Sequence, residues 1–340
     1  MELPEEGGGS FHCLISSSDG CIAKKSVPGE LLIELLSYLP IKSVCKFRCV
    51  SKSWLKLFTN DPFFAKLHLS HQSNESKLHI TSFLAKNYPE RGINKFYLAE
   101  TSDISKLFEL PFCLDTPSYY FVHGICNGMV LLSKLDNVYI WNPLTRDYIH
   151  IRCCPPESTI PLGHSMCRNF GFGLNQATNE YKVVSYRQSR VILSFDLKEE
   201  VLKRYHIHIR PELIFKDVYL ELVELGGLLC MFGIQFGVEL QIWVMKQYGV
   251  NGSWTKQFKI GLLGVCGSLE YLRPVGIANS GEIILIQSSV SSTKKIVLYN
   301  AETDSVRDVK IFDSGHWNVF AYTGSLISPK FISGLNHNRT

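Results

Sequence analysis

The sequence has little net charge, no long uninterrupted apolar run and no start typical of a secreted protein. Its 340 residues contain 35 Lys or Arg and 31 Asp or Glu, which gives a formal net charge of +4. That balance is too small to favour nucleic acid as the main ligand. The uncharged stretch 116–133 contains a proline and two glycines, so it does not predict a membrane-spanning helix. The acidic start lacks the features of a signal peptide. We therefore expect a cytoplasmic or nuclear protein with no membrane insertion.

The common catalytic and metal-binding motifs are missing as well. There is no Walker-type phosphate loop, no His-Glu-x-x-His and no Gly-x-Ser-x-Gly. The eleven cysteines are odd in number and irregularly spaced, as in a reduced intracellular protein. The metal candidates are Cys153, Cys154, His164 and Cys167 in a Pro-rich segment, and His206 and His208 on a predicted strand. Paired Cys-x-x-Cys spacing is absent, so the sequence predicts no metal, no cofactor and no catalytic residue.

What the sequence does contain is two regions of different periodicity. Residues 1–25 are rich in Gly and Ser and predict a flexible tail. Residues 26–70 show helical spacing, and residues 71–340 alternate with a period of two between turn signals. The chain is thus predicted to be an α+β multidomain protein, with a small helical unit followed by a mainly antiparallel β domain.

The helical region predicts four short helices. Ser26 is the expected cap of the first, with Pro28 in its first turn, and Pro40 is expected to start the second. Ser51 and the pair Asp61-Pro62 are expected to begin the third and fourth. A unit of this size seldom buries enough surface to be stable alone. Its Leu, Phe and Trp side chains therefore either pack on the β domain as a cap or form a docking surface for another protein.

Residues 27–54, VPGELLIELLSYLPIKSVCKFRCVSKSW, resemble an F-box of the plant type, and the Asp61-Pro62-Phe63-Phe64 that follows matches its usual continuation. Val27 stands where the family usually has Leu. The resemblance implies binding of a Skp-type adaptor, which connects to the cullin and RING subunits of a ubiquitin ligase. The family's adaptor-contacting positions correspond here to Pro28, Leu31, Leu32, Leu36, Leu39, Pro40, Val44, Arg48, Val50 and Trp54.

The β region contains a weak internal repeat. An aromatic residue near the end of an apolar strand recurs at Trp141, Phe195, Trp243 and Tyr299, with spacings of 54, 48 and 56 residues, and Phe96-Tyr97-Leu98 is a possible earlier copy. Asn or Asp follows the aromatic in three of the four copies, whereas Val244 follows in the third. Such spacing is close to that of a kelch-like β-propeller blade, and the region has room for five or six blades. A two-sheet β-sandwich is the alternative.

A second resemblance appears in this region. The segments 124–132, 140–146, 170–173 and 179–184 look like the plant F-box-associated interaction domain, as do 242–246, 253–256, 298–300 and 322–327. In that family the domain selects the protein to be ubiquitinated. The two resemblances together imply a non-catalytic substrate receptor of a Skp–cullin–F-box ligase, whose target binds a loop-rich rim. Candidate rims are 152–168, 210–217 and 261–273.

Two other functions remain open. The β domain could bind a glycan or small molecule, or act as a kelch-like enzyme with the helices as a mere cap. Alternatively, the protein could bind the adaptor but act outside degradation. The sequence does not identify the target.

Overall fold

The computed structural model divides the chain into two compact units, residues 1–75 and 76–340. It describes residues 11–12, 26–75, 82–87, 95–100, 107–110, 120–134, 137–151, 169–175, 177–187, 191–199, 202–206, 219–235, 238–261, 271–278, 280–288, 294–312 and 317–333. Within these residues no helix has the length and apolar content needed to cross a bilayer.

The first unit contains four helices and a two-stranded pairing. The helices are α1 (Gly29–Ser37), α2 (Ile41–Phe47), α3 (Lys52–Asn60) and α4 (Pro62–Glu75), and β1 (Phe11–His12) pairs with β2 (Ser26–Val27). The rest of the predicted tail lies outside the described residues. The helix α4 ends five residues beyond the predicted boundary.

Local sequence explains most of the helix starts. The side chain of Ser51 accepts a hydrogen bond from the backbone N–H of Trp54 (3.1 Å), so Ser51 caps α3 as predicted. Asp61 likewise accepts from the N–H groups of the two residues after Pro62, at 2.9 and 3.0 Å. The cap predicted at Ser26 is wrong. Ser26 is in strand β2, and Pro28 is the cap residue of α1, where its fixed φ of −53° suits a helix start.

A continuous series of aromatic side chains connects α2, α3 and α4. Phe47 lies edge-on to Trp54 at 5.5 Å between ring centroids, and Trp54 lies edge-on to Phe58 at 5.7 Å. Phe64 follows at 5.2 Å from Phe58. Each such aromatic pair adds about 0.5–1.5 kcal/mol beyond simple burial. The series therefore stabilises the core of this small unit more than aliphatic side chains alone would.

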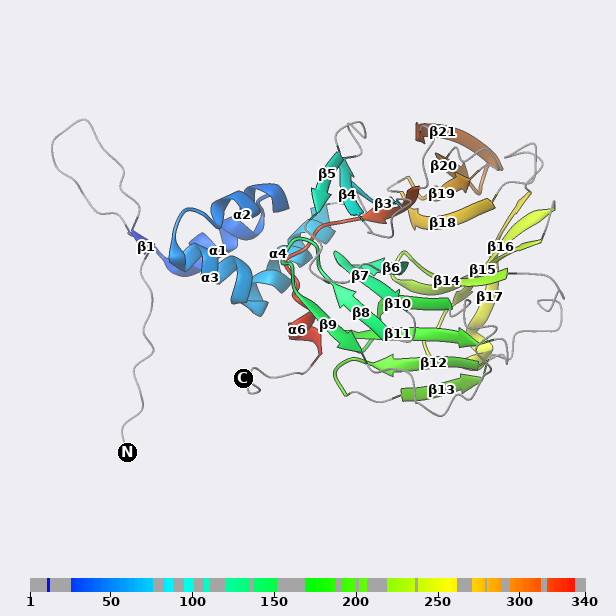
Figure 1. Cartoon of the computed structure of the whole chain (residues 1–340), viewed down its shortest axis with the longest axis horizontal. Helices are drawn as coiled ribbons and strands as arrows, with labels where there is room; N and C mark the ends of the chain where they lie inside the picture. The colour runs from blue at the N-terminus through cyan, green and yellow to red at the C-terminus, as the bar shows by residue number, and fades with distance from the viewer. Residues whose placement is uncertain are drawn as a thin grey trace. The chain divides into compact units, whose positions relative to one another are not determined.

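The second unit is built from five four-stranded antiparallel sheets (Figure 1). In spatial order the first is β22 (Trp317–Tyr322), β3 (Ser82–Asn87), β4 (Lys95–Glu100), β5 (Leu107–Leu110); the second is β6 (Phe121–Cys126), β7 (Met129–Lys134), β8 (Asn137–Trp141), β9 (Tyr148–Ile151). The third is β10 (Asn169–Asn175), β11 (Glu180–Arg187), β12 (Val191–Asp196), β13 (Leu202–His206); the fourth is β14 (Tyr219–Leu225), β15 (Leu228–Gln235), β16 (Glu239–Met245), β17 (Trp254–Gly261); the fifth is β18 (Tyr271–Ile277), β19 (Ile283–Ser288), β20 (Lys294–Asn300), β21 (Ser305–Phe312).

The first strand of each sheet, in this order, lies on the inside of a closed ring. Strand β10 contacts both β6 and β14, β14 contacts β18, and β22 contacts both β18 and β6. The ring closes through β22, which follows all the other strands in sequence yet pairs with β3, Trp317 opposite Asn87. The predicted propeller fold is therefore confirmed and the β-sandwich alternative is wrong. The described residues form five sheets, where the sequence allowed five or six blades.

Each aromatic of the repeat lies in the third strand of its sheet, and Phe96 lies in the third strand of the first sheet. Tyr299 joins the core between the fourth and fifth sheets, and Trp141 and Phe96 join the core between the first and second. Trp141 and Phe96 are both fully buried and meet edge-on at 5.2 Å, in a cluster with Phe320 and Tyr322 of β22. These aromatics are packing residues, as their alternation in apolar strands indicates.

Candidate protein-binding surface

Helix α1 exposes a row of large apolar side chains. Leu31 is 57% exposed, Leu35 64% and Tyr38 47%. Their spacing of four and three residues places them on one face, because residues at i, i+4 and i+7 lie above one another on a helix. A small unit that leaves such a face uncovered has an apolar surface suited to another protein.

Three further apolar side chains of the first unit are exposed. Val50 follows α2 and is 62% exposed, Leu55 lies on α3, and Phe63 in the first turn of α4 is 69% exposed. Every helix or the segment that follows it therefore contributes to the exposed apolar surface. Leu35, Leu55 and Phe63 were not among the predicted contact positions. Their exposure follows from how the helices pack, which their local spacing does not reveal.

The ten predicted contact residues separate into three groups. Pro28, Leu31, Pro40 and Val50 are exposed, and Leu32, Leu39, Arg48 and Trp54 are half-buried. Leu36 and Val44 form the third group, because they are only 4% and 0% exposed and pack in the core of the unit. Adaptor contact by the ten residues stays a prediction. The broad leucine stripe of α1 contains one side that packs inward and one that faces outward, and sequence spacing alone did not separate them.

The exposed face of α1 is held in place by polar contacts with α4. The Ser37 hydroxyl donates to the carbonyl of Glu34 (2.6 Å) and lies 2.7 Å from Nδ1 of His71. The ring of His71 also stacks on that of Tyr38, with centroids 3.9 Å apart. The carbonyl of Leu39, the residue after Tyr38, accepts a hydrogen bond from Nε2 of buried His68 (2.9 Å). Burial lowers the pKa of His68 below its usual 6.5. The end of α1 is thus fixed against α4.

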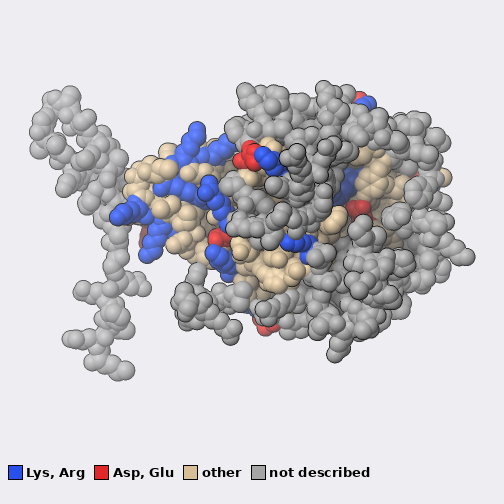
Figure 2. Space-filling view, in the orientation of Figure 1, with Lys and Arg blue, Asp and Glu red and all other residues tan. Residues whose placement is uncertain are grey.

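Basic side chains surround this apolar surface. Six of the ten charged residues between positions 26 and 75 are Lys or Arg. Figure 2 shows blue side chains gathered over the helices, with the tan surface of uncharged residues between them. A partner that covers this surface would therefore be complementary if it carried acidic residues around an apolar groove.

The inner strands of the propeller carry a polar network of their own. Arg273 lies over the ring of Phe320 at 4.7 Å, forms an ion pair with Glu221 (3.5 Å) and donates to the carbonyl of His123 (3.4 Å). Tyr271 donates its hydroxyl to the same Glu221. These contacts connect four of the five inner strands.

The predicted rims all connect the outer strand of one sheet to the inner strand of the next. Apart from Gly261 and residues 271–273, they lie outside the described residues, as do Cys153, Cys154, His164, Cys167 and His208. Among the described residues, no group of three or more His, Cys, Asp or Glu side chains is placed to hold a metal ion.

Comparison with known proteins assigns both units. A family model for the F-box domain matches residues 26–66, and a model for the F-box associated beta propeller domain matches residues 184–325. The chain is an F-box protein with an F-box associated β-propeller domain. The helices that expose Leu31 and Leu35 are therefore its F-box, and the ring of sheets contains its associated propeller.

Relatives of similar length support this assignment. F-box protein At3g07870 of Arabidopsis thaliana is 24% identical over 84% of this chain and 86% of its own length. The F-box/kelch-repeat protein At3g23880 and F-box protein CPR1 of the same plant are 24% and 21% identical, and the alignments cover 89% and 91% of this chain and 96% and 89% of those proteins. The resemblance inferred from the sequence is confirmed.

Proposed function

We propose that this F-box protein is a substrate receptor of a ubiquitin ligase. Its F-box binds a Skp-type adaptor, which connects to cullin and RING subunits, and its propeller binds a target protein. The observation that carries the proposal is the uncovered apolar face of α1 at the position of a matched F-box. We place this activity in the cytoplasm or nucleus.

The exposed leucines supply enough apolar surface to anchor a partner. Burying one leucine contributes about 1.5–3 kcal/mol, so Leu31 and Leu35 together would contribute about 3–6 kcal/mol. The surrounding Lys and Arg side chains would accelerate association with an acidic adaptor surface and make it sensitive to salt.

The propeller would act without catalysis of its own. A ring of five sheets is a rigid scaffold on which loops can carry specificity. Holding a target beside the ligase raises the effective concentration of the target's lysines near the charged ubiquitin-conjugating enzyme, which is how proximity accelerates a transfer.

The experiment is adaptor binding by the full chain and by the double variant Leu31→Asp, Leu35→Asp. Both positions are exposed on a helix, so folding is retained, which circular dichroism checks. We expect affinity to fall by about 100-fold or more, as loss of about 3 kcal/mol implies. Val238→Asp, at a 51% exposed position in the propeller, is the matched control and should bind as the wild type does.

A folded double variant that binds the adaptor like the wild type would contradict the proposal. Degradation itself is tested separately, by target abundance with and without proteasome inhibition. An adaptor-bound protein whose target does not accumulate on inhibition would act outside degradation.

A further inference from the structure

Among the four repeat copies at Trp141, Phe195, Trp243 and Tyr299, one is an exception, and that exception lies beside a pocket. In the other three copies the third strand ends at, or directly before, an Asn or Asp whose side chain accepts hydrogen bonds from the following turn. Asn142 accepts from the N–H of Leu144 (2.8 Å), Asp196 from that of Lys198 (3.0 Å), and Asn300 from that of Glu302 (2.9 Å). The third strand of the fourth sheet, β16, has Val244 instead, which has no acceptor.

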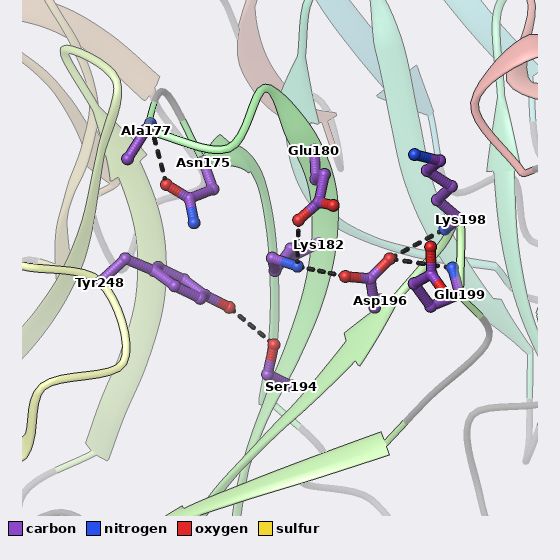
Figure 3. Close-up of polar contacts among 9 residues, drawn as sticks. All are labelled: Asn175, Ala177, Glu180, Lys182, Ser194, Asp196, Lys198, Glu199 and Tyr248. Atoms are coloured by element: carbon purple, nitrogen blue, oxygen red, sulfur yellow. Dashed lines mark hydrogen bonds and ion pairs between the residues drawn. The ribbon is translucent and has the colours of Figure 1, made fainter.

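The chain after β16 consequently takes a longer course. It continues through Lys246–Val250 and a 3₁₀ turn, η2 (Asn251–Ser253), before β17 begins. Tyr248 on this loop reaches the neighbouring sheet, where its hydroxyl lies 2.7 Å from the hydroxyl of Ser194 on β12 (Figure 3). The loop thus bridges the third and fourth sheets.

A pocket of about 470 Å³ lies beside this bridge, between the third and fourth sheets. This volume is within the usual range of ligand sites. Its walls are mainly apolar. They include Phe172 and Leu174 of β10, Leu229 of β15, and Met245 and Tyr248 beside the loop. A side chain or ligand that enters it must therefore have an apolar part.

One ammonium group in the pocket wall is already neutralised. Lys182 forms ion pairs with Asp196 and with Glu180 (3.0 Å), as Figure 3 shows. Asp196 uses its other carboxylate oxygen for the turn at Lys198. With two carboxylates on one ammonium, Lys182 leaves no positive charge for an anionic ligand.

The remaining carboxyl group in the wall is Glu224, at the end of β14. One of its oxygens accepts from the backbone N–H of Gly227. In the described part of the chain no Lys or Arg neutralises it, and burial raises its pKa above the usual value. Gly173 on the facing strand has no side chain over the stem of Glu224, where a Cβ would stand 3.6 Å from the Glu224 Cγ. Lys246 also lines the pocket, and its ammonium donates to the uncharged side chain of Gln257 (2.8 Å) in an exposed contact. The pocket therefore combines mainly apolar walls with one carboxyl group that pairs with no described Lys or Arg.

We propose that this inter-sheet pocket binds an arginine or lysine side chain of the target protein. The apolar stem would pack on Phe172 and Leu229, and the cationic end would pair with Glu224. The inference rests on the proposed function, since it identifies part of the surface with which the propeller would recognise its target.

The test measures retention of nonapeptide pools by the full chain. Each pool has one fixed central residue and randomised flanks, and further pools carry citrulline or Nε-acetyl-lysine at the centre. We expect the Arg or Lys pool to bind about ten-fold better than its uncharged counterpart, the ratio that one charge-assisted hydrogen bond supplies.

Two variants and one control assign the preference to the pocket. Glu224→Gln removes the charge but keeps an oxygen to accept from Gly227, so the turn is retained. Gly173→Leu covers Glu224 without backbone strain, since no left-handed φ is needed at that glycine. Both should abolish the preference for the basic pools. Glu302→Gln, the same change at an exposed turn of the fifth sheet, should leave it intact.

The proposal is overturned if acidic or uncharged pools bind best, or if Glu224→Gln keeps the basic preference. It is also overturned if free arginine amide competes as well as the Arg peptides, because the pocket would then recognise a small cation and not a protein segment. Adaptor binding by the same samples separates the two proposals. Loss of adaptor binding with an intact basic preference would contradict only the ligase role.

Discussion

Asn142 offers the sharpest test of how the propeller ring is held closed. Its side chain is fully buried in the turn after β8, and its amide nitrogen donates to the carbonyls of Ser325 (3.0 Å) and Ile327 (2.7 Å). Those carbonyls belong to the segment that directly follows the ring-closing strand β22. Replacing Asn142 with Ala should therefore release this segment as well as weaken its own turn.

The magnitude follows from the groups left without partners. A buried polar group that loses its hydrogen bond costs about 1–3 kcal/mol, and Asn142→Ala leaves two such carbonyls. Loss of the acceptor for Leu144 adds about 1 kcal/mol, by analogy with a helix cap. The total of about 3–7 kcal/mol is a large part of the stability of an ordinary domain.

The assay is urea unfolding of the full chain, followed by tryptophan fluorescence, since the adjacent Trp141 is buried against Phe96. Asn300→Ala is the matched control. Asn300 accepts from the same positions of its own turn, at 2.9 and 3.1 Å, in an exposed loop, so its loss should cost about 1 kcal/mol. If Asn142→Ala destabilises the propeller no more than Asn300→Ala does, the assignment of Asn142 as a ring-closing contact is refuted.

Three further outcomes are expected. Gly128→Ala should destabilise the propeller strongly, as measured by urea unfolding, because Gly128 has a φ of +72° and a Cβ there would stand 2.5 Å from the backbone nitrogen of Ser325. Gly281→Ala should cost much less, because Gly281 has a similar φ of +83° but a Cβ there would meet no atom within 4 Å. The stability of the F-box should fall as the pH drops below about 6.5, because the unfolded chain then binds a proton that buried His68, with its lowered pKa, does not bind. Hydrogen exchange of α4 at pH 5.5 and 7, corrected for intrinsic rates, should show weaker protection at pH 5.5 in the wild type and a smaller difference in His68→Gln. Equal protection of the wild type at both pH values would contradict this prediction. Ser51→Ala should cost the F-box about 1 kcal/mol in thermal unfolding, and a cost no greater than that of the exposed Ser53→Ala would show that the cap contributes little.

The features that the sequence predicted well are those with a local cause. Ser51 and Asp61 cap helices through atoms two or three residues away, so the pattern alone locates them. The repeated aromatics mark the third strand of each sheet because an apolar strand with an aromatic near its end has a similar local pattern in each copy, even where Val244 replaces the turn residue.

The features that it missed depend on contacts between distant residues. The pairing of β22 with β3 joins residues some 230 positions apart, and nothing in residues 317–322 identifies that partner. Leu35 and Leu36 are adjacent leucines with similar local surroundings, yet one is 64% exposed and the other 4%. The exception at Val244 was visible in the sequence, but the pocket beside Tyr248 appears only when the third and fourth sheets are placed side by side.

The closure of the first sheet by β22 also has a consequence during synthesis. Strand β3 leaves the ribosome about 230 residues before its partner does, which at about 5–20 residues per second is a wait of roughly 12–46 seconds. Throughout that interval the inner edge of β3 remains an unpaired strand, open to other nascent chains and to chaperones. A chain that ends before Trp317 would therefore keep that edge of β3 unpaired and leave the ring open.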